Sequence, residues 1–173
     1  MAHDVVSCKP AFTSAVESAS FIASNVLEPP GSPSSVRNLV SVKLVLVAAC
    51  ALVDTDGRVL IAQRPAGRPM AGLWEFPGGK VEAGERPEDT LMRELSEELG
   101  IVVDEACLAP LAFASYSYPQ FHLLMPLYVC RRWQGTVTAL EGQKLAWVRP
   151  NRLRDYPMPP ADEPLVSHLM TLL

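Results

Sequence analysis

Three glutamates crowd onto one predicted helix within the stretch GGKVEAGERPEDTLMRELSEELGI, residues 78–101. They are Glu94, Glu97 and Glu98, and the last two fall in the final turn, at the negative end of the helix macrodipole. Like charges three or four residues apart also repel, by roughly 0.2–0.5 kcal/mol per pair. The arrangement therefore costs stability unless a positive group lies against it. Several carboxylate oxygens that converge on an open site bind hard cations such as Mg²⁺ or Mn²⁺.

The predicted helix begins at Pro87 and ends before Gly100, because proline suits the first helical position and glycine the residue after the last. At about 100° per residue, the glutamates share one arc and face outward beside the turn PGGK, where Glu85 can reach them. The other arc is apolar and must face the core: it holds Leu91, Met92, Leu95 and Leu99. One carboxylate could activate a water for attack on phosphorus. A solvated acidic surface is the alternative that the helix alone leaves open.

The elements that must position this helix follow from hydrophobic patterning. Strands are predicted over residues 44–53, 58–64 and 73–76, with DTDG as the turn that brings the second back as the partner of the first. After the helix, strands are predicted over residues 107–118 and 122–133, joined by the turn YPQF, and over residues 144–148. Residues 161–173 have the apolar spacing of a terminal helix. Strands that flank two helices in mixed order predict an α+β fold of mixed α/β layers.

Residues 1–41 differ in composition from the rest of the chain. They are rich in Ser and Ala, carry few charges and end in EPPGSPSS, which predicts a disordered N-terminal extension before a domain over residues 42–173. A targeting peptide is the alternative. Asp4, Glu17 and Glu28 argue against a transit peptide, and no basic segment precedes an apolar one.

Composition excludes several classes of function. A net charge of −4 over 173 residues argues against a nucleic-acid polymer as partner. No apolar run reaches the roughly 18 residues of a membrane span. The four cysteines form no CxxC pair, which argues against a zinc site and favours a reducing compartment. We therefore expect a cytoplasmic protein with no membrane partner.

From Gly79 onward the chain has the pattern G-x5-E-x7-R-E-L-x-E-E-x-G-I, which resembles the Nudix box of the Nudix hydrolase family at every defined position. LWEFPGGK before the box and PPADEP near the end resemble the MutT type, the pyrophosphohydrolases that sanitise oxidised nucleotides. The resemblance covers roughly residues 43–173. The residues that match the box are Gly79, Glu85, Arg93, Glu94, Leu95, Glu97, Glu98, Gly100 and Ile101.

The resemblance implies a central mixed β-sheet between helices, with the box as a loop–helix–loop motif. It implies a Mg²⁺-dependent enzyme, with Mn²⁺ as a substitute, that hydrolyses a nucleoside triphosphate to its monophosphate and pyrophosphate. Glu94 or Glu98 would orient or deprotonate the water, and Arg93 would pair with Glu85 and fix the carboxylates. The implied metal ligands are Gly78, Glu94, Glu97, Glu98 and Glu141.

The implied substrate contacts are Arg64, Glu75, Phe76, Gly79, Lys80 and Asp162. Asp162 departs from the MutT type, which carries an asparagine that hydrogen-bonds the purine. A carboxylate accepts hydrogen bonds but donates only when protonated, so the discrimination of an oxidised base stays open. The alternative role for Asp162 is the N-cap of the terminal helix.

We expect a nucleoside triphosphate substrate, with 8-oxo-dGTP as the leading candidate, and a monomer or weak dimer. CTP, a methylated pyrimidine nucleotide or ADP-ribose is the alternative substrate. A non-catalytic nucleotide sensor is a further alternative, against which the complete set of box carboxylates argues.

Overall fold

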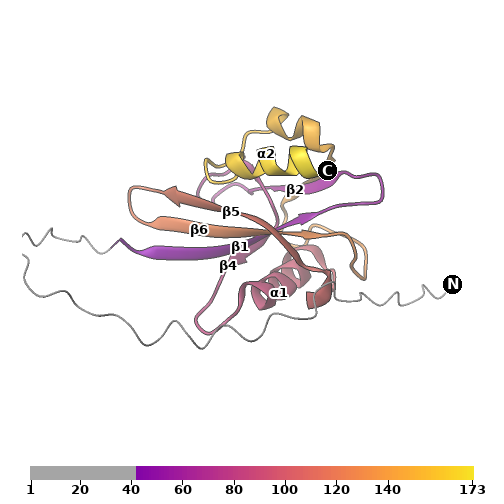
Figure 1. The fold of residues 1–173 in the computed structure, drawn as a ribbon, viewed down its shortest axis with the longest axis horizontal. Helices are drawn as coiled ribbons and strands as arrows, with labels where there is room; N and C mark the ends of the chain where they lie inside the picture. Colours follow the sequence, from indigo (N-terminus) through magenta and orange to yellow (C-terminus); the bar gives the residue numbers. More distant parts are fainter. Residues whose placement is uncertain (1–41) are drawn as a thin grey trace, which may run out of the picture. The chain divides into compact units, whose positions relative to one another are not determined.

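The computed structural model describes residues 42–173, so the predicted N-terminal extension over residues 1–41 lies outside the described residues. Two short 3₁₀ helices, Glu105–Cys107 and Pro150–Asp155, accompany the main elements (Figure 1). Those elements are, in chain order, β1 (Leu44–Leu52), β2 (Val59–Gln63), β3 (Trp74–Glu75), β4 (Gly78–Lys80), α1 (Pro87–Leu99), β5 (Ala109–Ser117), β6 (His122–Cys130), β7 (Lys144–Val148) and α2 (Glu163–Leu172).

The strands form two sheets that lie between the two helices (Figure 1). The larger sheet has the order β4-β1-β6-β5 and is mixed, because β1 runs parallel to β6 and antiparallel to β4. The smaller sheet has the order β3-β2-β7 and is antiparallel. The predicted α+β fold, with mixed strands between two helices, is confirmed.

Alternating side chains of β1 explain why a helix covers each face of the larger sheet. Successive side chains of a strand point to opposite faces, and both faces of β1 are buried. Ala49 and Ala51 belong to a core cluster with Leu165 and Leu169 of α2. On the other face, the cluster holds three leucines of α1, with Ala48, Cys50 and Leu52 of β1; these leucines are Leu91, Leu95 and Leu99.

Helix α1 has the predicted boundaries, since it begins at Pro87 and Gly100 follows it in the left-handed conformation with φ 67°. Each of its fully buried leucines contributes about 1.5–3 kcal/mol of hydrophobic stabilisation. That exceeds the roughly 0.2–0.5 kcal/mol of repulsion per pair among the neighbouring glutamates of the same helix. Packing behind the helix thus holds the acidic residues in place.

Two predictions of pairing are wrong. Strand β2 pairs with β3 and β7, and only an isolated bridge between Val53 and Val59 joins it to the end of β1. PGGK is also more than a turn, because Gly78–Lys80 is strand β4, paired antiparallel with β1. Glycine at position 78 allows this close approach, since a Cβ there would lie 2.1 Å from the carbonyl oxygen of Ala48.

None of the helices within residues 42–173 has the length and apolar character that crossing a membrane requires. Cys50 and Cys130 are fully buried core residues. The ring nitrogens of His122 lie 3.0 Å and 2.8 Å from the hydroxyl oxygens of Ser115 and Ser117, its neighbours across the β5–β6 pair.

Candidate active site

A cavity of about 540 Å³ gathers residues from both sheets, from helix α1 and from several connecting loops, including the one that leads into α2. Glu97, Arg93 and Glu85 do not line it. A second, shallower hollow near Trp147 and Arg149 contains no predicted site residue. The predicted site residues that line the larger cavity are Arg64, Glu75, Phe76, Gly78, Gly79, Lys80, Glu94, Glu98, Glu141 and Asp162.

Glu98, in the last turn of α1, is the most perturbed of the helix glutamates. Burial raises its pKa to about 7, and the negative charges of Glu94, Glu141 and Glu75 act in the same direction. A hydrogen bond from the backbone N–H of Gly78 partly opposes this effect. Glu98 therefore lies where negative charge accumulates, and a cation at this point would relieve the repulsion.

Glu94 lies directly against strand β4. A Cβ built on Gly79 would lie 2.2 Å from Oε1 of Glu94, so the carboxylate occupies the space that any larger residue would need. The same oxygen accepts a hydrogen bond from Nη1 of Arg93 at 2.7 Å. Glycine at position 79 therefore lets the carboxylate of Glu94 reach the cavity wall.

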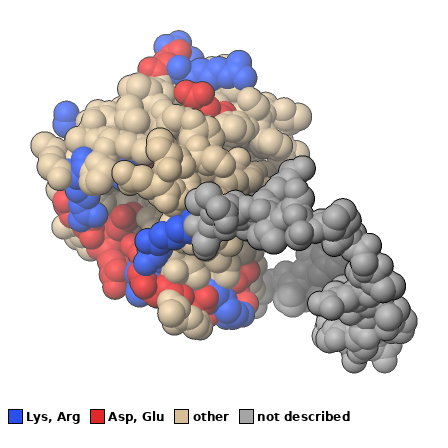
Figure 2. Space-filling model, turned by 90° about the vertical axis from the view of Figure 1, so that its left-hand side faces the viewer, with Lys and Arg blue, Asp and Glu red and all other residues tan. Residues whose placement is uncertain are grey.

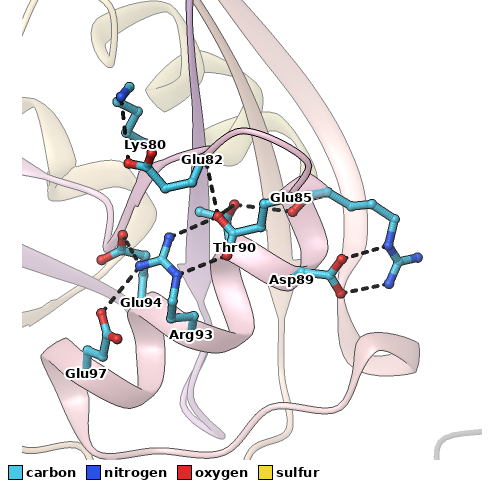
Figure 3. Close-up of polar contacts among 9 residues, drawn as sticks. Lys80, Glu82, Glu85, Asp89, Thr90, Arg93, Glu94 and Glu97 are labelled. Carbon is cyan, nitrogen blue, oxygen red and sulfur yellow. Dashed lines mark hydrogen bonds and ion pairs between the residues drawn. The ribbon is translucent and has the colours of Figure 1, made fainter.

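Arg93 and Glu85 form the predicted ion pair, drawn in Figure 3. Two guanidinium nitrogens donate to the two carboxylate oxygens of Glu85, at 2.9 Å and 3.0 Å. The hydroxyl of buried Thr90 donates to the same carboxylate at 2.7 Å. These bonds, with one from the backbone N–H of Glu82, lower the pKa of Glu85 to about 2. Glu85 is thereby kept ionised as a fixed anchor for Arg93.

Glu97 lies apart from the other helix glutamates. Its side chain is 58% exposed, and among residues 42–173 it pairs with Nη1 of Arg93 alone, at 3.3 Å. Figure 2 shows acidic side chains gathered in a band on the lower part of the molecule, at the level of α1, with basic side chains beside them. The structure thus puts Glu97 outside the cavity, and its predicted metal-binding role remains a prediction.

Glu141 reaches the cavity from the loop between β6 and β7. The loop is fastened to the end of α1, because the backbone N–H of Leu140 and Nε2 of Gln143 both donate to the carbonyl of Glu98, at 3.0 Å and 2.9 Å. The side chain of Gln143 also accepts from the backbone N–H of Glu141 at 2.9 Å. One oxygen of Glu141 pairs with Nη2 of Arg68 at 3.0 Å. Sequence reasoning missed Arg68 and Gln143, since neither belongs to a spaced motif.

The donor chemistry of the cavity fits a divalent cation. Glu94, Glu98 and Glu141 offer carboxylate oxygens, which Mg²⁺ prefers. Within residues 42–173, however, no group of three or more acidic, His or Cys side chains is already arranged to hold a metal. Instead, Glu94 and Glu141 each direct an oxygen at an arginine. A carboxylate has two oxygens, so Glu94 can keep its hydrogen bond to Arg93 while its other oxygen joins Glu98 around an ion.

Asp162 provides a second perturbed carboxyl group in the cavity. It is 5% exposed, and burial raises its pKa to about 7, assisted by the negative charge of Glu75. A hydrogen bond from the backbone N–H of Phe76 and the charge of Arg64 act in the opposite direction. Asp162 occupies the predicted N-cap position of α2, but its side chain makes no capping hydrogen bond.

Arg64 and Glu75 form an ion pair in the cavity wall, with Nε 2.6 Å from Oε2. Burial raises the pKa of Glu75 above its ordinary value, although the charge and hydrogen bond of the Arg64 guanidinium act in the opposite direction. Glu75 is the carboxylate that acts on both Glu98 and Asp162. The cavity therefore joins a strongly acidic region beside α1 to a buried, proton-binding carboxyl group beside α2.

Comparison with known proteins gives consistent matches. Residues 48–168 match the NUDIX domain. A CTP pyrophosphohydrolase of Escherichia coli is 42% identical over 75% of this chain and 94% of its own length. An 8-oxo-dGTP diphosphatase of the same organism is 34% identical over 75% of this chain and 99% of its own. The solution structure of the E. coli ORF135 protein superposes with a TM-score of 0.67 at 38% identity, covering 76% of this chain and 92% of that one.

Proposed function

The chain belongs to the Nudix hydrolase family and is a nucleotide pyrophosphohydrolase, and we propose that it is Mg²⁺-dependent and prefers cytosine nucleoside triphosphates as substrates. The observation that carries the choice of base is Asp162, a buried carboxyl group in the wall of the cavity. The E. coli CTP pyrophosphohydrolase, at 42% identity, gives independent support.

A carboxyl group reads a base through its donors and acceptors. When protonated, Asp162 can accept from the N4 amine of cytosine and donate to N3, which satisfies both groups. The raised pKa of about 7 keeps a protonated fraction available at neutral pH. The rings of Tyr118 and Phe121, which line the same cavity, offer apolar surface to the base.

The reaction follows from the acidic region of the cavity. A water oxygen forms a bond to a phosphorus of the triphosphate, a phosphoanhydride P–O bond breaks, and the products are a nucleoside monophosphate and pyrophosphate. Glu94 or Glu98 orients or deprotonates this water. Glu94, Glu98 and Glu141 would hold Mg²⁺, which supplies charge stabilisation to the phosphate oxygens when it is bound. Arg64 and Lys80 line the cavity as cations for the phosphates.

8-oxo-dGTP is the second candidate substrate. An ionised Asp162 accepts from both N1–H and the N2 amine of a guanine, so the same residue can serve a purine in its other protonation state. The E. coli 8-oxo-dGTP diphosphatase, at 34% identity, supports this candidate.

The test is hydrolysis of CTP, dGTP, 8-oxo-dGTP, ATP and ADP-ribose, each with Mg²⁺ and with EDTA. Pyrophosphate release measures turnover of the four triphosphates, and AMP release measures turnover of ADP-ribose, which splits into AMP and ribose 5-phosphate. ATP is included because adenine presents the same donor–acceptor pair as cytosine on a larger ring. We expect the highest kcat/KM for CTP and no turnover in EDTA. A clear preference for 8-oxo-dGTP over every other nucleotide would reject the cytosine proposal and support the second candidate.

A further inference from the structure

One ion pair at the rim of the cavity joins two of the loops that line it, the loop between β2 and β3 and the loop between β6 and β7. Nη2 of Arg68 lies 3.0 Å from Oε2 of Glu141, and the side chains are 61% and 38% exposed. A hydrogen bond anchors the loop that carries Arg68, because Nη1 of Arg64 donates to the carbonyl of Pro69 at 3.1 Å. Hydrogen bonds thus anchor the chain beside each of the two residues, while the ion pair itself is exposed.

Glu141 interacts with a cation, Arg68, and also with an anion, Glu98. Its loop is hydrogen-bonded to the carbonyl of Glu98, and its charge contributes to the raised pKa of Glu98. Glu141 thus already lies within electrostatic reach of the carboxylates that would hold a metal. Because its ion pair with Arg68 is exposed to solvent, breaking this pair costs little free energy.

We propose that a divalent cation and Arg68 compete for Glu141, and that Arg68, once released, binds a phosphate of the nucleotide. This inference rests on the proposed function, since it assigns a new substrate-positioning residue to the same cavity. The exchange leaves no charge unpaired. Glu141 gives up the Arg68 guanidinium and binds the divalent cation. The guanidinium gives up Glu141 and binds phosphate oxygens, which arginine contacts in a bidentate manner.

Arg68 is better suited to this exchange than Arg64, the other arginine in the cavity wall. Arg64 is only 32% exposed and is committed to Glu75 and to the carbonyl of Pro69. Within residues 42–173, Glu141 is the one residue that pairs with the Arg68 guanidinium, although the charge of Arg68 also acts on Glu75. Release from Glu141 therefore makes Arg68 available, and metal and triphosphate should bind with positive coupling.

The first experiment measures Mn²⁺ affinity by electron paramagnetic resonance, without nucleotide. The proteins are the parent, Arg68→Gln, Glu141→Gln and the double variant. Arg152→Gln is the matched control, because Arg152 is an exposed, ion-paired arginine outside this cavity. We expect Arg68→Gln to bind Mn²⁺ several-fold more tightly than the parent, Glu141→Gln to bind it more weakly, and Arg152→Gln to match the parent.

The double variant separates competition from general electrostatics. If Arg68 acts by holding Glu141, Arg68→Gln has no effect once Glu141 is glutamine. Equal tightening in both backgrounds, or none in the parent background, would overturn the competition. This measurement needs no turnover, so it tests the exchange even if every nucleotide in the panel proves inert and the proposed function fails.

The second experiment measures the binding of inorganic triphosphate in the presence of saturating Mn²⁺, by calorimetry. We expect Arg68→Gln to weaken it by about tenfold and Arg152→Gln to leave it unchanged. With an active substrate, the same variant should raise KM more than it lowers kcat. Triphosphate affinity equal to that of the parent would overturn the phosphate-binding role.

Discussion

The guanidinium of Arg93 binds both oxygens of Glu85, with Nε 2.9 Å from Oε1 and Nη2 3.0 Å from Oε2. Its remaining terminal nitrogen donates to Glu94 at 2.7 Å. One side chain thus connects the loop before α1 to a carboxylate in the cavity wall. This bidentate geometry requires the planar fork of arginine, which a lysine ammonium cannot reproduce.

We therefore expect Arg93→Lys to lower kcat by roughly 10–100-fold, because the charge remains while Glu94 loses its fixed orientation. Arg86→Lys is the matched control: Arg86 makes a similar bidentate pair with Asp89, but outside the cavity. Steady-state turnover and circular dichroism of the three proteins check this. Parent-like turnover in Arg93→Lys would show that the fork does not position Glu94.

Alanine substitution should affect stability at one glycine of β4 and turnover at the other. Gly78 has φ 144°, and its new Cβ would lie 2.1 Å from the carbonyl oxygen of Ala48, so Gly78→Ala should cost about 2 kcal/mol or more of unfolding free energy. At Gly79 the new Cβ would instead meet the flexible end of Glu94. We expect Gly79→Ala to stay folded and to lose at least about tenfold in kcat.

Urea unfolding and turnover of both glycine variants separate the two effects. A stable, active Gly78→Ala would mean that β4 can move away from β1. An active Gly79→Ala would mean that Glu94 has other productive positions.

The features that sequence predicts well here are those with a local physical signal. The boundaries of α1 follow from Pro87 and Gly100, and its buried face follows from the spacing of Leu91, Leu95 and Leu99. The pair of Arg93 with Glu85 came from the resemblance to a family motif. Each of these depends on residues that are near one another in the chain, or on a pattern with many fixed positions.

The features that sequence missed are set by contacts between distant segments. PGGK favours a turn locally, yet β4 forms because β1 offers it a partner edge. Arg68 and Glu141 are 73 residues apart, and a lone arginine in a loop has no spacing that marks it. The burial of Asp162, which raises its pKa, likewise depends on how α2 packs and not on its own neighbours in the sequence.

The helix glutamates should contribute unequally to turnover. Glu98 lines the cavity and is half-buried, whereas Glu97 is 58% exposed and lies outside it. We expect Glu98→Gln to reduce kcat by roughly 10²–10³-fold and Glu97→Gln by less than about tenfold. Assays at saturating Mg²⁺, with EDTA as the metal-free baseline, test this. Equal losses would mean that Glu97 turns into the cavity when the metal binds.

Asp162→Asn should stabilise the protein at neutral and higher pH. The pKa of Asp162 is raised from 3.8 to about 7 in the folded state, so the folded protein binds the proton more tightly than the unfolded chain. Stability conferred by this group is therefore lost as pH rises from about 4 to 7. Asparagine removes the titration, and we expect a gain on the order of 1–3 kcal/mol at pH 8 that vanishes near pH 4.

Urea unfolding at pH 4, 6 and 8 measures this difference. Glu163→Gln is the control, since Glu163 is the adjacent carboxylate and is exposed. A constant difference between Asp162→Asn and the parent at all three pH values would show that the burial of Asp162 does not perturb its protonation.

The choice of base should depend on pH through the same carboxyl group. Below its pKa of about 7, Asp162 is protonated and matches cytosine; above it, Asp162 is ionised and matches guanine. The groups whose charges act on it are Glu75 and Arg64. We expect the ratio of kcat/KM for CTP to that for dGTP to fall as pH rises from 6 to 8.5.

Taking a ratio cancels the titration of groups that both substrates share, such as the carboxylates around the metal. Asp162→Asn can present a donor and an acceptor at every pH, so its ratio should stay flat across this range. A parent ratio that is equally flat would show that Asp162 does not choose the base by its protonation state. A slope that persists in Asp162→Asn would place the responsible group elsewhere in the cavity.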